Sequence, residues 1–161
     1  MEIIEYSSKY QDDIKKLLCE LQEYIVSIDP YHFNIIGDDY KDKIYEKDMN
    51  CVLKNDGKIY LAIEDNKVIG MILGIIEKPE YDFDYERKTK VGHVLELIVT
   101  KKVRNNGVGS KLLKRMEEYF FNKDCYTINI DVFGYNIQGR KFYEKNGYHA
   151  RMVNMSKQIK K

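Results

Sequence analysis

Apolar side chains recur along the chain at two spacings, about 3.6 residues and two residues, which predict helices and strands respectively. The residues from Ile3 to Tyr6 are expected to form a short strand. A helical spacing follows, carried by Ile14, Leu17, Leu18, Leu21 and Ile25. This helix should end at Asp29, because Pro30 disfavours helical backbone in the residue before it. A second helix is predicted from Tyr40 to about Met49.

The middle of the chain carries strand patterns. Residues Ile59 to Ile63 and Lys67 to Ile76 are rich in strand-forming residues, and they flank Glu64-Asp65-Asn66, where Asp and Asn tolerate turn backbone. We therefore expect an antiparallel hairpin. From Val91 to Thr100 the chain is almost continuously apolar, which is typical of a strand buried on both faces. This strand should lie at the centre of the sheet.

In the last third of the chain, helical and strand patterns alternate. A helix from Val108 has an apolar stripe of Leu112, Leu113, Met116, Tyr119 and Phe120. Alternation from Tyr126 to Phe133 predicts a strand. A helix from Asn136 to Asn146 would be capped by the Asn136 side chain and ended by Gly147 in the left-handed conformation. A last strand is expected from Tyr148 to about Ser156.

The order of these elements predicts the fold class. A strand–helix–strand crossover occurs only in the second half, so the first half should be antiparallel and the second half partly parallel. The expected class is α/β (α+β), with a mixed, mostly antiparallel sheet and helices on both faces. Only two prolines and no Gly/Ser-rich run interrupt the chain, so residues 1–161 are expected to form a single domain.

Composition and charge exclude several function classes. A formal net charge of +1 provides no chain-wide field for holding nucleic acid. No apolar run approaches the ~18 residues that a membrane span needs, and Met1 to Glu5 has no export pattern, so no membrane partner is expected. The three cysteines, Cys19, Cys51 and Cys125, are widely spaced. They fit a reducing compartment, so a cytoplasmic location is expected.

The segment from Arg104 to Ser110 (Arg-Asn-Asn-Gly-Val-Gly-Ser) has the features of an anion site. It opens a helix, whose first N–H groups are unbonded and carry a partial positive charge, and Gly107 and Gly109 keep Cβ atoms out of the way of an anion. From Val99 to Met116 the chain holds six basic residues and no acidic one. The alternatives are a glycine loop beside a solvated helix face, or an RNA-binding surface, which would lack a recognisable aromatic platform.

Two patterns in this half of the chain resemble a known family. The first is Arg-x-x-Gly-x-Gly after a buried apolar strand. The second, after a further strand, consists of Asn136, Gly139, Phe142-Tyr143 and Gly147-Tyr148. Together they resemble the acetyl-CoA-binding core of the GNAT N-acetyltransferase superfamily, which implies a three-layer α/β/α fold whose strands 4 and 5 splay apart. Asn105 departs from the family pattern, in which many relatives carry Gly, although Asn also tolerates left-handed backbone.

The resemblance also implies where acetyl-CoA, the expected co-substrate, would bind. Its pyrophosphate would be held by the backbone N–H groups of Asn105, Asn106, Gly107, Val108, Gly109 and Ser110. Arg104 would add positive charge at the mouth of this loop. The pantetheine arm would pair in strand fashion with Leu97, Ile98 and Val99 and would hydrogen-bond with Asn136. Tyr143 would stand near the thioester sulfur, and no metal is expected.

Acetyl transfer to an amine needs a neutral nitrogen, yet an alkylamine of pKa ~10.4 is neutral in only about one molecule in 10³ at pH 7. Glu96, a carboxylate within the apolar central strand, is the first candidate for the base, and His93 on the same strand is the second. A backbone N–H near Leu97 to Val99 would stabilise the oxyanion. The Tyr143 phenol would protonate the departing thiolate. The structural alternatives are a salt-bridged Glu96 and a packed Tyr143.

The leading hypothesis is therefore an acetyl-CoA-dependent N-acetyltransferase that transfers the acetyl group directly, in a ternary complex, to a primary amine. The alternative is a CoA-binding regulatory module without turnover. Two acidic clusters would border the acceptor: Asp38, Asp39 and Asp42, and Glu77, Glu80, Asp82, Asp84 and Glu86. They would attract a cationic amine, unless they are merely solvated loops. A polyamine, an aminoglycoside-like sugar amine and a protein amino group all stay open as acceptors, and so does a homodimer.

Overall fold

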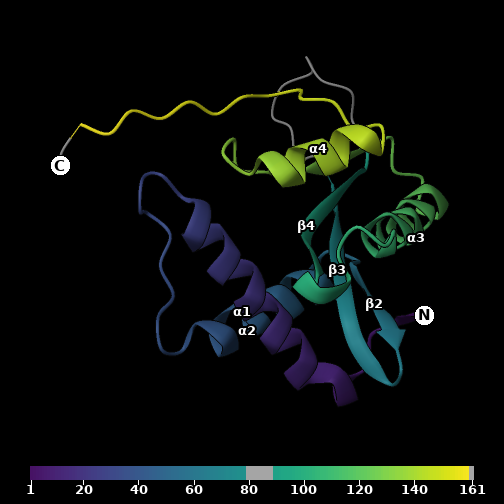
Figure 1. Cartoon of the computed structure of the whole chain (residues 1–161). Helices are drawn as coiled ribbons and strands as arrows, with labels where there is room; N and C mark the ends of the chain where they lie inside the picture. Colours follow the sequence, from purple (N-terminus) through teal and green to yellow (C-terminus); the bar gives the residue numbers. More distant parts are fainter. Residues whose placement is uncertain (79–88, 160–161) are drawn as a thin grey trace.

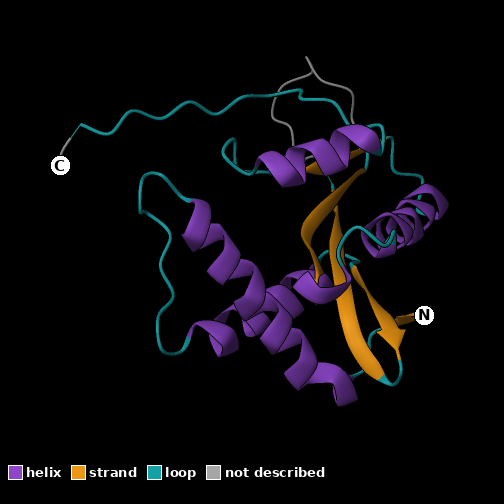
Figure 2. Ribbon diagram, in the orientation of Figure 1, coloured by secondary structure: helices purple, strands orange, loops and turns teal. Residues whose placement is uncertain are grey.

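The computed structural model describes residues 1–78 and 89–159 as a sheet between two layers of helices (Figures 1 and 2). The strands are β1 (Glu2–Glu5), β2 (Lys58–Glu64), β3 (Lys67–Glu77), β4 (Val91–Val99) and β5 (Thr127–Ile130). The α-helices are α1 (Gln11–Ile28), α2 (Tyr40–Lys54), α3 (Val108–Asn122) and α4 (Ile137–Lys145). Short 3₁₀ turns lie at Ser8–Tyr10 (η1) and Lys101–Val103 (η2). The predicted fold class is confirmed.

The strands lie in the order β1-β2-β3-β4-β5. The first three pairs are antiparallel, and β4 and β5 are parallel. This follows from the connections: β2 and β3 meet at the tight turn Asp65-Asn66, whereas α3 carries the chain back across the sheet between β4 and β5. Both turn residues have positive φ, at 50° and 60°, as the sequence predicted for an Asp-Asn turn.

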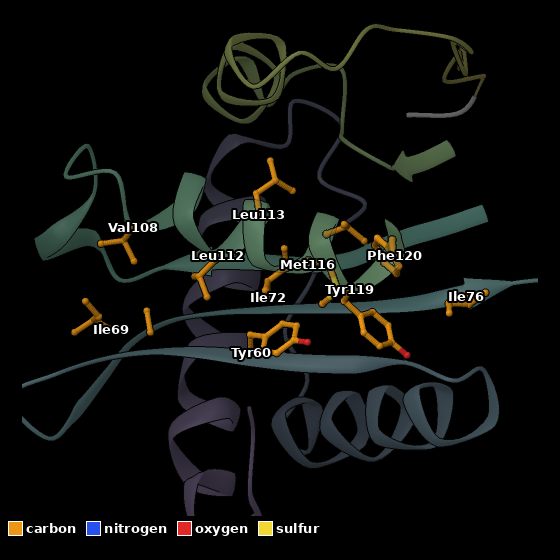
Figure 3. Packing of buried hydrophobic residues seen from close by; sticks show 12 residues of the cluster. Tyr60, Ile69, Ile72, Ile76, Val108, Leu112, Leu113, Met116, Tyr119 and Phe120 are labelled. Carbon is orange, nitrogen blue, oxygen red and sulfur yellow. The ribbon is translucent and has the colours of Figure 1, made fainter. Parts of the chain in front are cut away.

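Each face of the sheet buries one set of alternating side chains. Tyr60 and Ile72 pack on one face, whereas the next residues, Leu61 and Leu73, pack on the other. The first face is covered by α3, whose apolar stripe points onto β2 and β3 (Figure 3). The second face is covered by α1 through Ile14, Leu17 and Leu18 and by the inner side of α2. The two cores therefore fix α3 on one side of β4 and α1 and α2 on the other.

The expectation of a sixth strand from Tyr148 to Ser156 is wrong. No strand is present in residues 148–159, and beyond Tyr148 the chain leads away from the fold (Figure 1). The apolar side chains that suggested it are exposed, with Met152, Val153 and Met155 at 75–90%. An alternating pattern makes a strand only where another strand satisfies its backbone groups, and no strand of the described part of the chain pairs with this segment. The fifth strand is also shorter than predicted and stops at Ile130 instead of Phe133.

The end of β5 creates the opening that the family resemblance predicts. Val91 to Val94 of β4 pair with Thr127 to Ile130, and among residues 1–78 and 89–159 no strand pairs with the rest of β4 on that side. At the same point, the pairing of β4 with β3 is interrupted by a β-bulge: Leu73 pairs with Glu96 and Gly74 with Val94, so Leu95 is the extra residue. From Leu95 onward, one edge of β4 is therefore open.

Candidate active site

The loop before α3 presents unpaired backbone donors. Asn105 and Gly107 adopt left-handed backbone, with φ of 66° and 78°, and Gly107 is the N-cap of α3 without any side-chain cap. Within residues 1–78 and 89–159, no N–H from Asn105 to Ser110 donates a hydrogen bond. These donors, together with the positive end of the helix dipole, form a cradle suited to an anion such as a pyrophosphate. The left-handed Asn105 confirms that Asn serves here in place of Gly.

The two glycines of the loop have different reasons to be glycine. A Cβ built on Gly107 meets nothing within 4 Å, so this position borders open space beside the cradle. A Cβ built on Gly109 comes within 3.2 Å of the Phe142 ring of α4. The expectation that both glycines keep space free for the anion is therefore wrong for Gly109, which instead lets α3 and α4 pack closely.

The Arg104 side chain is held by contacts with β4 and α1. Its Nε donates to the Val99 carbonyl at 2.8 Å, and its guanidinium lies 3.4 Å from the Glu20 carboxylate of α1. The guanidinium also lies over the Tyr24 ring at 5.4 Å from the centroid. Glu20 accepts a further hydrogen bond from the Lys101 N–H at 2.8 Å. The cradle loop is thus held against α1, and Glu20 and Tyr24 had no local signal in the sequence that marked them.

The open edge of β4 offers backbone groups next to the cradle. The N–H of Thr100 donates to the Ile69 carbonyl of β3 at 2.9 Å. Because successive residues of a strand direct their backbone groups to opposite edges, those of Ile98 point toward β3, and those of Leu97 and Val99 point toward the opening. Arg104 already uses the Val99 carbonyl. The Val99 N–H and both backbone groups of Leu97 are the ones left for an extended ligand such as pantetheine.

Asn136 caps α4, as the sequence predicts. Its side-chain oxygen accepts from the Gly139 N–H at 3.0 Å and from the Tyr24 hydroxyl at 3.1 Å. A Cβ on Gly139 would come within 2.6 Å of this carboxamide, so only glycine leaves room for the cap. In the described part of the chain both hydrogen bonds use the carboxamide oxygen, so its NH₂ group can donate to a ligand. Tyr24 therefore contacts both Arg104 and Asn136, and these two residues lie on opposite sides of the opening.

Tyr143 and Glu96 lie within electrostatic reach of each other. Tyr143 is half-buried in α4, where its ring packs edge-on against Phe142 and Tyr148. Burial, and then the negative charge of Glu96, raise the pKa of Tyr143 to about 12. Its hydroxyl therefore keeps its proton at neutral pH. Burial, and then the charge of Asp48, raise the pKa of Glu96 to about 7, against a smaller opposite effect of Lys47.

Asp48 is a candidate that the sequence reasoning missed. This residue of α2 is 2% exposed, and its Oδ2 has no hydrogen-bond partner in the described part of the chain. Burial raises the pKa of Asp48 to about 6, although Lys47 opposes the shift. A signal was available, because position 48 falls on the helix face that Tyr40 and Ile44 define. A carboxylate on the inner face of an amphipathic helix is costly to bury.

His93, the second candidate base, is held by two carboxylates. Its Nδ1 lies 2.7 Å from the Glu77 carboxylate of β3, and its Nε2 lies 3.2 Å from the Asp131 carboxylate beyond β5. Both ring nitrogens are therefore engaged. This arrangement favours Glu96 over His93 as a group that faces a substrate.

The acidic clusters are partly neutralised. Asp39 forms an ion pair with Lys43, and Asp42 forms one with Lys15. Of the second cluster, Glu77 contacts His93, and positions 80–86 lie outside the described residues. Two of the three carboxylates in the first cluster are therefore neutralised by lysines.

Two further features bear on other kinds of site. In residues 1–78 and 89–159, no group of His, Cys, Asp and Glu side chains is arranged to hold a metal ion. No described helix combines the length and the apolar content that crossing a membrane requires. Cys19, Cys51 and Cys125 are free thiols.

Comparisons with known proteins agree with this geometry. The sequence profile of the Acetyltransferase (GNAT) family matches residues 19–148. An uncharacterised N-acetyltransferase of Methanocaldococcus jannaschii is 36% identical over 95 residues, which are 58% of this chain and only 54%, about half, of that relative. A mutant of a Bacillus halodurans protein superposes with a TM-score of 0.81 at 15% identity, over 99% of both chains. An aminoglycoside antibiotic 6'-N-acetyltransferase of Acinetobacter haemolyticus superposes with a TM-score of 0.72 at 20% identity, over 99% of this chain and 100% of that one. At these identities the two superpositions establish the fold.

Proposed function

The chain belongs to the GNAT acetyltransferase family, and we propose that it transfers an acetyl group from acetyl-CoA to a primary amine of a small cationic molecule or of a protein. The observation that carries the proposal is the row of unpaired backbone N–H groups from Asn105 to Ser110 at the start of α3, beside the edge of β4 that β5 leaves open. Glu96 on β4 and Tyr143 on α4 would supply a proton acceptor and a proton donor next to this edge. Direct transfer in a ternary complex requires such a pair.

Acetyl-CoA would bind along the open edge of β4 and the start of α3. The unpaired N–H groups from Asn105 to Ser110 would take the pyrophosphate, and the positive end of α3 would add to the attraction. The Val99 N–H and the backbone of Leu97 would pair with the pantetheine arm, and the Asn136 NH₂ group would donate to one of its carbonyls. Arg104 would act mainly by holding the loop in place, because its guanidinium is engaged with Glu20 and Val99.

The proton transfers follow from the two pKa values. Glu96, with a pKa of about 7, would take a proton from the acceptor's ammonium, either directly or through water. The neutral amine would attack the thioester carbonyl, and a backbone N–H of β4 would stabilise the oxyanion. As the C–S bond breaks, Tyr143 would give its proton to the CoA sulfur. The second proton lost by the amine nitrogen would restore the Tyr143 phenol.

The test is the release of free thiol from acetyl-CoA in the presence of a panel of primary amines. We expect amine-dependent release by the wild-type chain and loss of release in the Glu96→Gln, Tyr143→Phe double variant. Tyr31→Phe, a change at a residue that is 39% exposed and outside the site, is the matched control and should release thiol normally. Tight binding of acetyl-CoA without thiol release for any amine would refute the proposal in favour of a regulatory CoA-binding module.

A further inference from the structure

Tyr24 contacts both sides of the opening from a third element of the fold. It lies half-buried in the second half of α1. Its hydroxyl donates to the side-chain oxygen of Asn136 at 3.1 Å, across 112 positions of the chain. The Arg104 guanidinium lies over its ring, 5.4 Å from the centroid. Asn136 caps α4 and Arg104 belongs to the cradle loop, so one side chain joins the two parts that would enclose acetyl-CoA.

The hydrogen bond from Tyr24 fixes the direction in which the Asn136 carboxamide faces. The Gly139 N–H can only donate, so the atom that it contacts at 3.0 Å must be the carboxamide oxygen. The Tyr24 hydroxyl contacts the same oxygen and therefore donates to it. With two donors on its oxygen, the carboxamide cannot turn over without losing both hydrogen bonds. Its NH₂ group stays available as a donor, and an amide carbonyl of the pantetheine arm is the complementary acceptor.

On the other side of the opening, α1 holds the cradle loop. Glu20 lies one turn before Tyr24, so both side chains project from the same face of the helix. The Glu20 carboxylate lies 3.4 Å from the Arg104 guanidinium and accepts from the Lys101 N–H at 2.8 Å. Arg104 Nε in turn donates to the Val99 carbonyl at 2.8 Å. The loop is therefore tied to α1 and to β4 at the point where the pyrophosphate would bind.

We infer that Tyr24 is a positioning residue for acetyl-CoA, whose hydroxyl directs the Asn136 NH₂ group toward the pantetheine arm and whose ring supports Arg104 and the cradle loop. The inference rests on the proposed function and deepens it, because it adds to the acetyl-CoA site a residue that acts through two others. A site that is held in its binding geometry beforehand loses less conformational entropy when the ligand binds. The contribution of Tyr24 therefore belongs to the affinity for acetyl-CoA.

The Tyr24→Phe variant separates positioning from folding. It removes the hydroxyl and keeps the ring beside Arg104. The connection before α4 also retains a second hydrogen bond to the segment after α1, from Asn34 Nδ2 to the Tyr135 hydroxyl at 3.0 Å. We therefore expect the variant to fold, which urea unfolding checks.

Calorimetric titration with acetyl-CoA measures the effect. We expect Tyr24→Phe to raise the Kd about fivefold, the effect of one lost hydrogen bond of ordinary net strength. Tyr45→Phe is the matched control, because the Tyr45 hydroxyl is also half-buried and hydrogen-bonded, with Tyr6 at 2.8 Å and Gln11 at 3.3 Å. None of these three residues contacts the cradle loop or Asn136 in the described hydrogen bonds, so the Kd of this control should stay within about twofold of the wild type.

A double-mutant cycle shows whether the hydroxyl acts through Asn136. Asn136→Ser keeps a good capping residue for α4 and removes the NH₂ group. In this background Tyr24→Phe should change the Kd by less than about twofold, whereas Tyr24→Leu, which also removes the ring beside Arg104, should still weaken binding. An unchanged Kd in Tyr24→Phe alone, or the same fold-change in both backgrounds, would overturn the inference. Equal Kd values for Tyr24→Phe and Tyr24→Leu would overturn the part assigned to the ring.

A failure of this inference is distinguishable from a failure of the proposed function. The titrations need no acceptor, so they test Tyr24 even if no amine supports thiol release. Where an amine does support release, Tyr24→Phe should raise the KM for acetyl-CoA about fivefold and leave kcat within about twofold, because positioning acts equally on the bound substrate and the transition state. A lower kcat with an unchanged KM would overturn the inference and leave the proposed function intact.

Discussion

The burial of Asp48 predicts that the protein loses stability as the pH rises from 5 to 8. The pKa of Asp48 is about 6 in the folded chain, against an ordinary value of 3.8. Between these values the folded protein holds a proton that the unfolded chain has already released. Because the unfolded state binds fewer protons there, the free energy of unfolding falls with rising pH. The contribution of protonated Asp48 to the free energy of unfolding is fully present below about pH 4, and it is lost as the pH passes through about 6.

The size of the loss follows from the shift. At 1.36 kcal/mol for each pKa unit, the rise from 3.8 to about 6 corresponds to about 3 kcal/mol. This is a large share of the ~5–15 kcal/mol that a domain of this kind has in total. In the Asp48→Asn variant the side chain cannot ionise. The cost of burying the amide is the same at each pH, so it cancels when one variant is compared at two pH values.

Urea unfolding at pH 5 and at pH 8 measures this difference. We expect the wild type to lose about 1.4 kcal/mol more than Asp48→Asn between the two pH values, because only about one pKa unit of the shift, from pH 5 to about 6, lies within this range. Glu46→Gln, an exposed charge change on the same helix, should follow the wild type. Parallel pH dependence in the wild type and Asp48→Asn would show that Asp48 titrates as an ordinary exposed acid, and would refute the reasoning from burial.

Three further predictions address the catalytic groups and the cradle. Tyr143→Phe should lower turnover by roughly 10- to 10⁴-fold with little change in acetyl-CoA affinity, measured by thiol release and titration, and unchanged turnover would leave the residue a packing role. Glu96→Gln should lose most activity at neutral pH and less toward pH 9, where more amine is already neutral, and an equal loss at every pH would contradict its role as base. Gly107→Val should weaken the stabilisation by acetyl-CoA, which is ~2.7 kcal/mol at a hundredfold excess over Kd, measured by thermal shift. Gly147→Val is the control, because Gly147 is also left-handed (φ 90°) and has equally open surroundings. This variant should keep the full stabilisation by acetyl-CoA. An equal loss of stabilisation in both variants would point to backbone strain alone.

The elements that the sequence predicts well are those whose pattern is decided locally. The apolar stripe of α3 and the continuous run of β4 each reflect burial against the whole sheet, and both are found close to the predicted positions. The cap at Asn136 and the left-handed Asn105 follow from side-chain chemistry within a few residues. In each case the determining contacts are either periodic or close in sequence.

The failures involve contacts that a single segment cannot reveal. The pattern from Tyr148 to Ser156 alternates well enough for a strand, but whether another strand lies beside it is decided elsewhere in the fold. Glu20 and Tyr24 look like ordinary polar positions of α1, and only the packing of α1 against the cradle loop and α4 gives them partners. Asp48 was visible as an acid on an apolar face, but its almost complete burial and its unpaired Oδ2 were not.

The bulge at Leu95 determines the face of the sheet on which Glu96 lies. In a regular strand, positions 94, 96 and 98 share one face, yet Val94 packs on the α3 side and Ile98 on the side of α1 and α2. The extra residue reverses the alternation between them. Glu96 lies two residues before Ile98 and therefore shares its face, which α1 and α2 cover. Without the bulge, the alternation that starts at Val94 would direct Glu96 toward α3. The same irregularity coincides with the end of pairing to β5, so the side chain of the candidate base changes face at the point where the edge of β4 becomes open.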